Sequence, residues 1–133
     1  MPHVFEYALL RAVPRQDRGE SMNVGVLLYC ADLDYLRCRS HVDPDRLRAL
    51  DQELDMDTLT AALTQLCGAC DGSEKRAPVT GISLGQRFRW LTAPRSTLVQ
   101  TSPTHPGLTS DPDADLDRLF NRLVLPSSGK APG

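Results

Sequence analysis

The chain has 133 residues, with 15 Lys+Arg against 17 Asp+Glu, a formal net charge of -2 and 5% aromatic residues. A chain of this length is expected to form one domain that needs neither a disulfide nor a metal to fold. The near-neutral charge argues against a general nucleic-acid binder, which depends on an excess of Lys and Arg. The charges are nonetheless divided, because residues 51–74 carry acidic but no basic side chains and residues 75–110 carry Lys and Arg but no acidic ones.

The start of the sequence lacks a basic segment followed by a long apolar run, and no run approaches the roughly 18 apolar residues that cross a bilayer. We therefore expect a cytoplasmic protein that does not contact membranes. Because the cytoplasm is reducing, the cysteines are expected to be thiols and not disulfides. They are Cys30, Cys38, Cys67 and Cys70.

Three β-strands are predicted over residues 4–13, 22–30 and 35–40. The first is apolar on both faces, as in a buried strand, whereas polar and apolar residues alternate in the third. Residues 31–34 are typical of the hairpin turn that would join the second strand to the third. Gly25 lies inside the second strand, which indicates a bulge or the close approach of another backbone or a ligand.

Three helices are predicted, and each begins near an aspartate: after Asp43, near Asp55 or Asp57, and after Asp111. In the first and third cases a proline follows at the first helical position, where its missing N–H is tolerated. Apolar residues recur at spacings of three and four in all three segments, which gives each helix one face toward a core. The third helix is expected to end before Pro126.

Between the second and third helices the sequence predicts two further short strands, at residues 87–91 and 98–100. In the first of these, Phe88 and Trp90 are expected to face the core, with arginines on the other side. Residues 101–106 contain two prolines and are predicted to form a loop.

This order of elements predicts a single α+β domain over residues 1–125. We expect a mostly antiparallel sheet of about four to five strands, packed with three helices. Residues 126–133 are short and polar, and are expected to form a flexible C-terminal tail.

The Cys67-Gly-Ala-Cys70 motif has the spacing at which two thiolates bind a metal or form a redox disulfide. Zinc needs four ligands, however, and His3, His41, His105 and the other cysteines form no second pair with ligand spacing. Both motif cysteines continue the apolar stripe of the predicted helix, so packing is the favoured interpretation and metal or redox chemistry the alternative. We expect no metal and no cofactor.

The run from Arg18 to Gly25 places charged and amide groups where a loop enters an apolar strand. Polar groups at such a boundary need partners. In the favoured interpretation, Glu20 and Asn23 hold the loop by bonding backbone N–H groups, or Glu20 pairs with Arg11 on the neighbouring strand. In the alternative, these side chains recognise a ligand for which the glycines leave room.

Residues 92–106 form the densest polar stretch of the chain. Arg95 is suited to bidentate binding of an anion, Ser96 adds a hydroxyl, and the charge of His105 can change near neutral pH. A phosphate or carboxylate would fit this stretch, although clusters of Ser, Thr and Pro are also ordinary loop chemistry. No nucleophile elbow, phosphate loop, dinucleotide-binding glycine motif or His-Glu-x-x-His motif occurs in the sequence.

Five motifs spread over nearly the whole chain resemble those of the bacterial DUF3037 family, in an actinobacterial-type form. They are Tyr7 to Pro14, Arg18 to Leu28, Leu91 to Thr97, Gln100 to His105 and Leu116 to Phe120. The resemblance implies no activity, but a frequent neighbour encoded beside such proteins is a HipA-like serine/threonine kinase, which implies a partner or antitoxin-like role. The polar positions that match the motifs are Arg11, Glu20, Asn23, Arg95, Ser96, Gln100 and His105.

Two functional hypotheses follow. The leading one, which the resemblance implies, is a cytoplasmic interaction or regulatory partner of a HipA-like kinase, and the absence of a complete catalytic set favours it over an enzyme. The alternative is a small enzyme or ligand-binding protein in which Glu20 or His105 acts as general base and Arg95 as electrostatic stabiliser. Its anion site requires two polar regions to converge: Arg95, Ser96 and His105 on one side, and Arg11, Glu20 and Asn23 on the other.

A third interpretation, nucleic-acid binding through the basic segment, is disfavoured. Base stacking would need exposed aromatic side chains, and Phe88 and Trp90 are expected to be required in the core.

Overall fold

The computed structural model of the chain describes residues 2–71, 83–93 and 97–126. These residues form a five-stranded antiparallel sheet packed with four helices, which confirms the α+β class and adds one helix to the expected three. In chain order the elements are β1 (His3–Ala12), β2 (Met22–Cys30), β3 (Tyr35–Ser40), α1 (Pro44–Leu50), α2 (Met56–Asp71), α3 (Leu84–Leu91), β4 (Val99–Thr101), β5 (His105–Thr109) and α4 (Pro112–Leu123).

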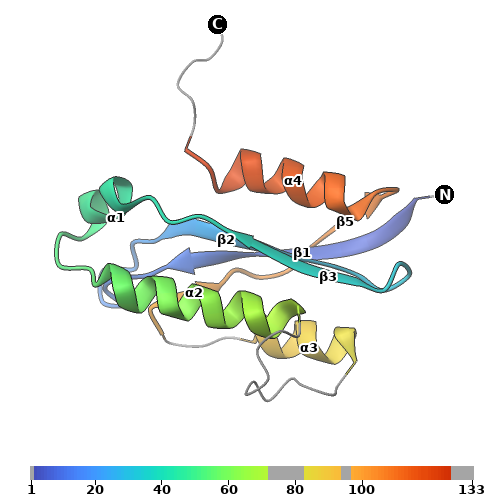
Figure 1. Cartoon of the computed structure of the whole chain (residues 1–133), viewed down its shortest axis with the longest axis horizontal. Helices are drawn as coiled ribbons and strands as arrows, with labels where there is room; N and C mark the ends of the chain where they lie inside the picture. The colour runs from blue at the N-terminus through green and yellow to red at the C-terminus, as the bar shows by residue number, and fades with distance from the viewer. Residues whose placement is uncertain (1, 72–82, 94–96, 127–133) are drawn as a thin grey trace, which may run out of the picture.

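The sheet is built around β1, which pairs antiparallel with β2 along one side and with two short strands along the other. The strand order is β3-β2-β1-β4, and β5 lies beside the other half of β1, where Tyr7 pairs with His105. Helix α4 covers one face of this sheet, and α2 and α3 cover the opposite face (Figure 1). None of the helices in the described ranges is long and apolar enough to cross a membrane.

Alternation along β1 divides the apolar side chains between two cores. Leu10 and Ala12 belong to the cluster on the α2–α3 side, whereas Phe5 and Leu9 belong to the cluster under α4. The apolar stripes of the helices complete the two clusters. On the α2–α3 side they contribute Leu59, Leu63, Leu66, Phe88 and Leu91, and on the α4 side Leu116, Leu119 and Phe120.

The three predicted helix starts are confirmed by their caps. The carboxylates of Asp43, Asp55 and Asp111 each accept a hydrogen bond from the backbone N–H three residues on, at 3.3, 3.2 and 3.3 Å. Each cap satisfies an N–H that has no partner within its helix. Pro44 and Pro112 begin α1 and α4, as the sequence predicts.

The expectation at Gly25 is also confirmed. A Cβ atom on this residue would lie 2.9 Å from the Arg39 carbonyl oxygen on β3 and 2.9 Å from a methyl carbon of Leu10 on β1. The β1–β2 register shifts at the same level, between Leu10 and Arg11, as in a β-bulge.

The predicted strand at residues 87–91 is wrong, because these residues lie in α3. A capping box between Ser83 and Gln86 starts the helix, with side-chain and backbone groups of both residues hydrogen bonded. Phe88 is buried as expected, but Trp90 is 39% exposed because two residues along a helix are about 200° apart. The alternation of polar and apolar residues in this short segment therefore resembled a strand by coincidence.

The predicted loop at residues 101–106 is shorter than expected. Thr101 ends β4, and His105 already begins β5. Pro106 lies within β5 at the edge of the sheet, a position where a proline is tolerated in a strand. The proline content of the segment therefore concealed the fifth strand.

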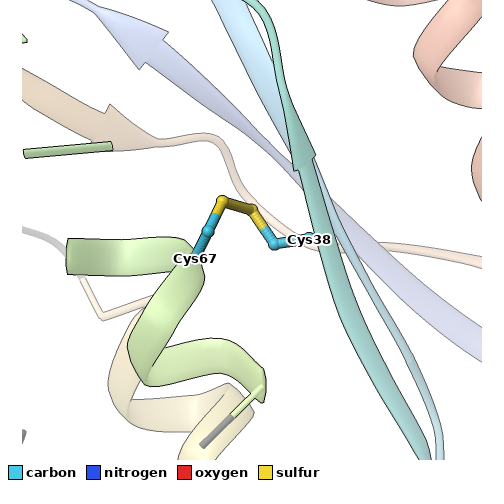
Figure 2. The surroundings of a disulfide bond; sticks show 2 residues. All are labelled: Cys38 and Cys67. Carbon is cyan, nitrogen blue, oxygen red and sulfur yellow. A yellow bond between two sulfur atoms is a disulfide. The ribbon is translucent and has the colours of Figure 1, made fainter. Parts of the chain in front are cut away.

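The expectation that all the cysteines are thiols is wrong for two of them. Cys38 on β3 and Cys67 on α2 form a disulfide whose Cα atoms are 5.4 Å apart (Figure 2). The alternation of β3 turns Cys38 and the buried Leu36 toward α2, and that Cα separation is one that a disulfide spans. Cys70 packs in the same core, as expected, so the two cysteines of the motif have different environments.

Candidate functional site

Three of the residues singled out in the sequence lie side by side across the sheet. Arg11 on β1 has Asn23 on β2 as its register partner on one side and Gln100 on β4 on the other. Arg11 shares a face with Leu9, which packs under α4. On that face, the Asn23 side chain donates a 3.1 Å hydrogen bond to the carbonyl of Leu123, at the end of α4. We call Arg11, Asn23 and Gln100 the Arg11 row.

The amide side chains at the two ends of the Arg11 row are hydrogen bonded to other parts of the chain. Gln100 Nε2 donates to the Gln16 side chain and to the Thr97 carbonyl, each at 3.1 Å, and so joins the β1–β2 loop to the segment before β4. Within the described part of the chain, the half-buried Arg11 guanidinium forms no hydrogen bond or ion pair. The row therefore presents one cation between two amides.

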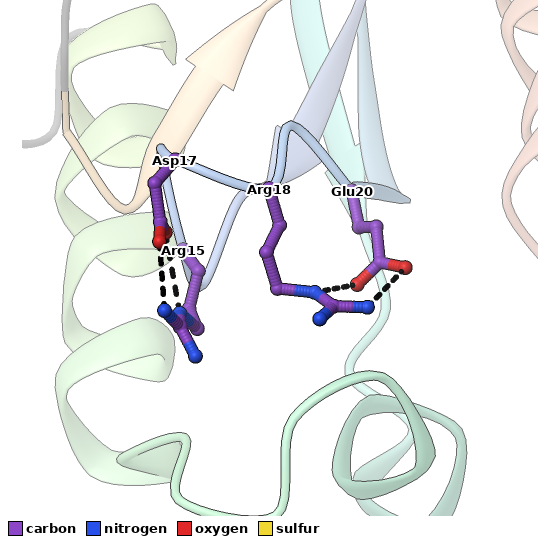
Figure 3. A network of polar contacts seen from close by, with 4 residues as sticks. All are labelled: Arg15, Asp17, Arg18 and Glu20. Carbon is purple, nitrogen blue, oxygen red and sulfur yellow. Dashed lines mark hydrogen bonds and ion pairs between the residues drawn. The ribbon is translucent and has the colours of Figure 1, made fainter.

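Glu20 lies outside the row. Its carboxylate accepts two hydrogen bonds from the Arg18 guanidinium, at 2.8 and 3.0 Å, so the pairing with Arg11, one of the two arrangements considered for Glu20, is wrong (Figure 3). These bonds, together with the charge of Arg18, lower the pKa of Glu20. A carboxylate with a lowered pKa is a weaker proton acceptor, which disfavours the general-base role considered for it.

A second ion pair lies beside the first in the same loop. Arg15 donates to the Asp17 carboxylate at 2.7 and 3.2 Å (Figure 3). The loop and the end of α1, at Leu50 and Asp51, line a shallow surface hollow of about 10 Å³. This volume holds about one water molecule and is far below that of pockets that enclose a drug-sized ligand.

His105 lies on β5, where its ring contacts that of Tyr7 at a centroid distance of 5.3 Å. Tyr7 precedes Arg11 by four residues on the same strand, which corresponds to roughly 13 Å along a strand. His105 and the Arg11 row thus border the same face without contact. Glu20, held by Arg18 in the loop, belongs to neither.

Arg95 and Ser96, the other two predicted site residues, lie outside the described residues. Within the described ranges, no group of three or more His, Cys, Asp or Glu side chains could hold a metal ion.

The structure reveals an apolar surface that the sequence did not indicate. Val4 on β1 and Leu108 on β5 are register partners, and they are 60% and 65% exposed. On the same face of β1, Glu6 accepts two 2.9 Å hydrogen bonds from Arg89 of α3. No strand was predicted at residues 105–109, so nothing in the sequence indicated that Leu108 lies beside Val4.

The model of one protein family, described as a protein of unknown function (DUF3037), matches residues 7–124. The chain belongs to this family. Membership confirms the resemblance and assigns no activity. No curated protein and no solved structure matches the chain.

The DUF3037 match extends from within β1 to the residue that follows α4. It therefore includes the whole Arg11 row, both short strands β4 and β5, and Leu108. Val4 precedes it, so one half of the exposed apolar pair lies outside the matched residues.

Proposed function

We propose that this DUF3037 protein is a cytoplasmic interaction or regulatory partner of a HipA-like serine/threonine kinase and is not itself an enzyme. The observation that carries the proposal is the exposed apolar pair Val4 and Leu108 at the edge of the sheet. Two large apolar side chains that lie opposite each other on neighbouring strands form a surface that a protein partner can cover.

The backbone next to this pair supports the same proposal. Strand β5 pairs with β1 on one side and, among the described residues, with no strand on the other. An open strand edge offers N–H and C=O groups to an added strand, while neighbouring side chains give specificity. An extended segment of the kinase would fit here, with apolar residues set against Val4 and Leu108.

The polar residues favour binding over catalysis. Glu20 is occupied by Arg18 and has a lowered pKa, and His105 contacts an aromatic ring. A general base is most effective with a pKa near the working pH and with a hydrogen bond to a reacting group.

The proposal is tested by isothermal titration of the full chain with the co-encoded HipA-like kinase. Changing both Val4→Glu and Leu108→Glu is expected to weaken binding by about 10- to 100-fold, because two charges would be buried against an apolar partner surface. Thr60→Glu combined with Thr64→Glu, which adds the same two charges on the exposed side of α2, is the matched control and should bind like the wild type. Absence of binding by the wild-type protein, or unchanged binding by the double variant, would contradict the proposal.

One observation favours a second candidate, the binding of a small anion. Arg11 is a half-buried cation with no partner in the described part of the chain, and the amides of Asn23 and Gln100 flank it. A guanidinium between hydrogen-bonding amides suits a carboxylate or phosphate. Arg95, Ser96 and His105 remain its proposed further members.

Inorganic phosphate is the probe for this second candidate. Phosphate should raise the melting temperature of the wild type, and Arg11→Ala should abolish the increase, since binding to the folded state alone stabilises it. Arg48→Ala, which removes an exposed arginine from α1, should retain the increase. An equal increase in Arg11→Ala would reject the site.

A further inference from the structure

The Cys38–Cys67 disulfide joins the sheet to the helical layer that covers one of its faces (Figure 2). The two residues are 29 apart in sequence, and the chain between them includes α1 and most of α2. A bridge of this kind restricts both the unfolded chain and the movement of α2 relative to β3.

The same helix is also held by contacts that do not depend on the disulfide. Leu59, Leu63 and Leu66 are buried in the core against the sheet. Breaking the disulfide should therefore loosen α2 without unfolding the domain, because an apolar core of this size is sufficient for folding.

The end of α2 is coupled to α3. Arg87 of α3 donates a 3.2 Å hydrogen bond to the carbonyl of Cys70, in the last turn of α2. The Nε atom of the same arginine is buried and has no hydrogen-bond partner in the described part of the chain. An unsatisfied buried donor makes this contact less favourable, so movement of α2 should readily change it.

The four cysteines differ in their access to reagents. Cys38 and Cys67 are partly exposed, whereas Cys30 and Cys70 are completely buried. Thiol–disulfide exchange requires that a reagent reach the sulfur atom. The pair that forms the bond is therefore also the pair that a reagent can reach.

We propose that Cys38 and Cys67 form a reversible redox switch that controls how firmly α2 and α3 are held on the sheet. In oxidation, one thiolate of the pair attacks a low-molecular-weight disulfide such as glutathione disulfide and releases one thiol. The other thiolate then displaces the second thiol and forms the S–S bond. The protein loses two protons and two electrons, and the reagent takes them up as two thiols.

The first measurement is a thiol count by alkylation and mass spectrometry on the full chain. In glutathione disulfide two cysteines should react once the protein is denatured, and after reduction all four should react. The peptide map should place the difference at Cys38 and Cys67. Four reactive cysteines in the oxidising buffer would overturn the proposal.

The second measurement asks whether the helical layer responds. Trp90 is the single tryptophan of the chain and lies on α3, so its fluorescence reports on this layer. Reduction should shift its emission, increase amide hydrogen exchange in the second half of α2, and lower the melting temperature by roughly 10 °C. Reduction with no change in Trp90 emission or α2 exchange would show a static bridge and overturn the switch.

Variants test whether the redox response comes from the Cys38–Cys67 pair. Cys67→Ser should behave like the reduced wild type in both buffers, whereas Cys70→Ala, one turn further along the same helix, should keep the full redox response. If Cys67→Ser does not fold, the reduced and alkylated wild type replaces it. A redox response that persists in Cys67→Ser, or one that disappears in Cys70→Ala, would contradict the assignment.

Discussion

The two faces of the sheet are covered by different means. Two helices cover one face, where a disulfide and an extended apolar core hold them. A single helix, α4, covers the other face with one apolar stripe and with polar contacts at its start, middle and end: Tyr35 donates to Asp113, Arg39 pairs with Asp117, and Asn23 donates to the Leu123 carbonyl. Buried apolar side chains and a disulfide therefore hold the helices on the α2–α3 face. On the α4 face, buried apolar side chains hold the helix and polar contacts fix its position.

The largest expected effect concerns the α2–α3 face. Phe88→Ala should lower the free energy of unfolding by about 3–5 kcal/mol, because Phe88 is fully buried and stacks on Tyr29. Trp90→Ala should lower it by at most about 2 kcal/mol, since Trp90 is on the exposed side of α3. Urea denaturation measures both. Equal losses would indicate that residues 87–91 form a strand with both rings in the core.

A smaller effect is expected at the end of α4. Asn23→Ala removes the hydrogen bond to the Leu123 carbonyl and should lower the free energy of unfolding by about 1–2 kcal/mol. Asn121→Ala, on the exposed side of α4, is the control and should change it by less than about 0.5 kcal/mol. Matching losses in urea denaturation would show that the polar contact does not hold α4.

The smallest effect depends on pH and concerns the start of α4. Burial, and then the 2.6 Å hydrogen bond to Asp113, raise the pKa of Tyr35 above its usual value near 10. Above about pH 10 the unfolded chain loses this proton first, so the contribution of Tyr35 is complete below that pH and declines as the pH rises further. Guanidinium denaturation between pH 8 and 11 should show a steeper decline for the wild type than for Tyr35→Phe. If the stability of the wild type and that of Tyr35→Phe decline in parallel with pH, the Tyr35–Asp113 contact does not contribute to the pH dependence.

The same comparison explains which parts of the fold could be predicted. Helix α4 combines a cap, a proline and an apolar stripe within one continuous segment, so its limits follow from local chemistry. Helix α3 has only eight residues, and the alternation of Phe88 and Trp90 fits both a strand and a short helix. Its capping box, Ser83 with Gln86, was the local signal that could have decided between them.

The proximity of two residues of the candidate site could be predicted only where their strands follow each other directly in the sequence. Arg11 and Asn23 lie on strands joined by one loop, so their proximity could be anticipated. The position of Gln100 beside Arg11 and the exposure of Leu108 depend on strands that return to β1 from distant sequence. The bond between Cys38 and Cys67 depends equally on how a helix packs on the sheet, which spacing alone does not determine.

The pairing of β1 also has a consequence for the order of folding. Leu9 exchanges hydrogen bonds with Ser102, 93 residues further along the chain, and β4 and β5 together form one entire side of β1. Contacts this distant in sequence slow folding, because a long loop must close before they form. During synthesis, β1 and β2 are complete long before β4 and β5, and until then an apolar strand edge is open. A nascent chain interrupted before residue 99 should therefore aggregate or bind chaperones, whereas one extended past α4 can close the sheet.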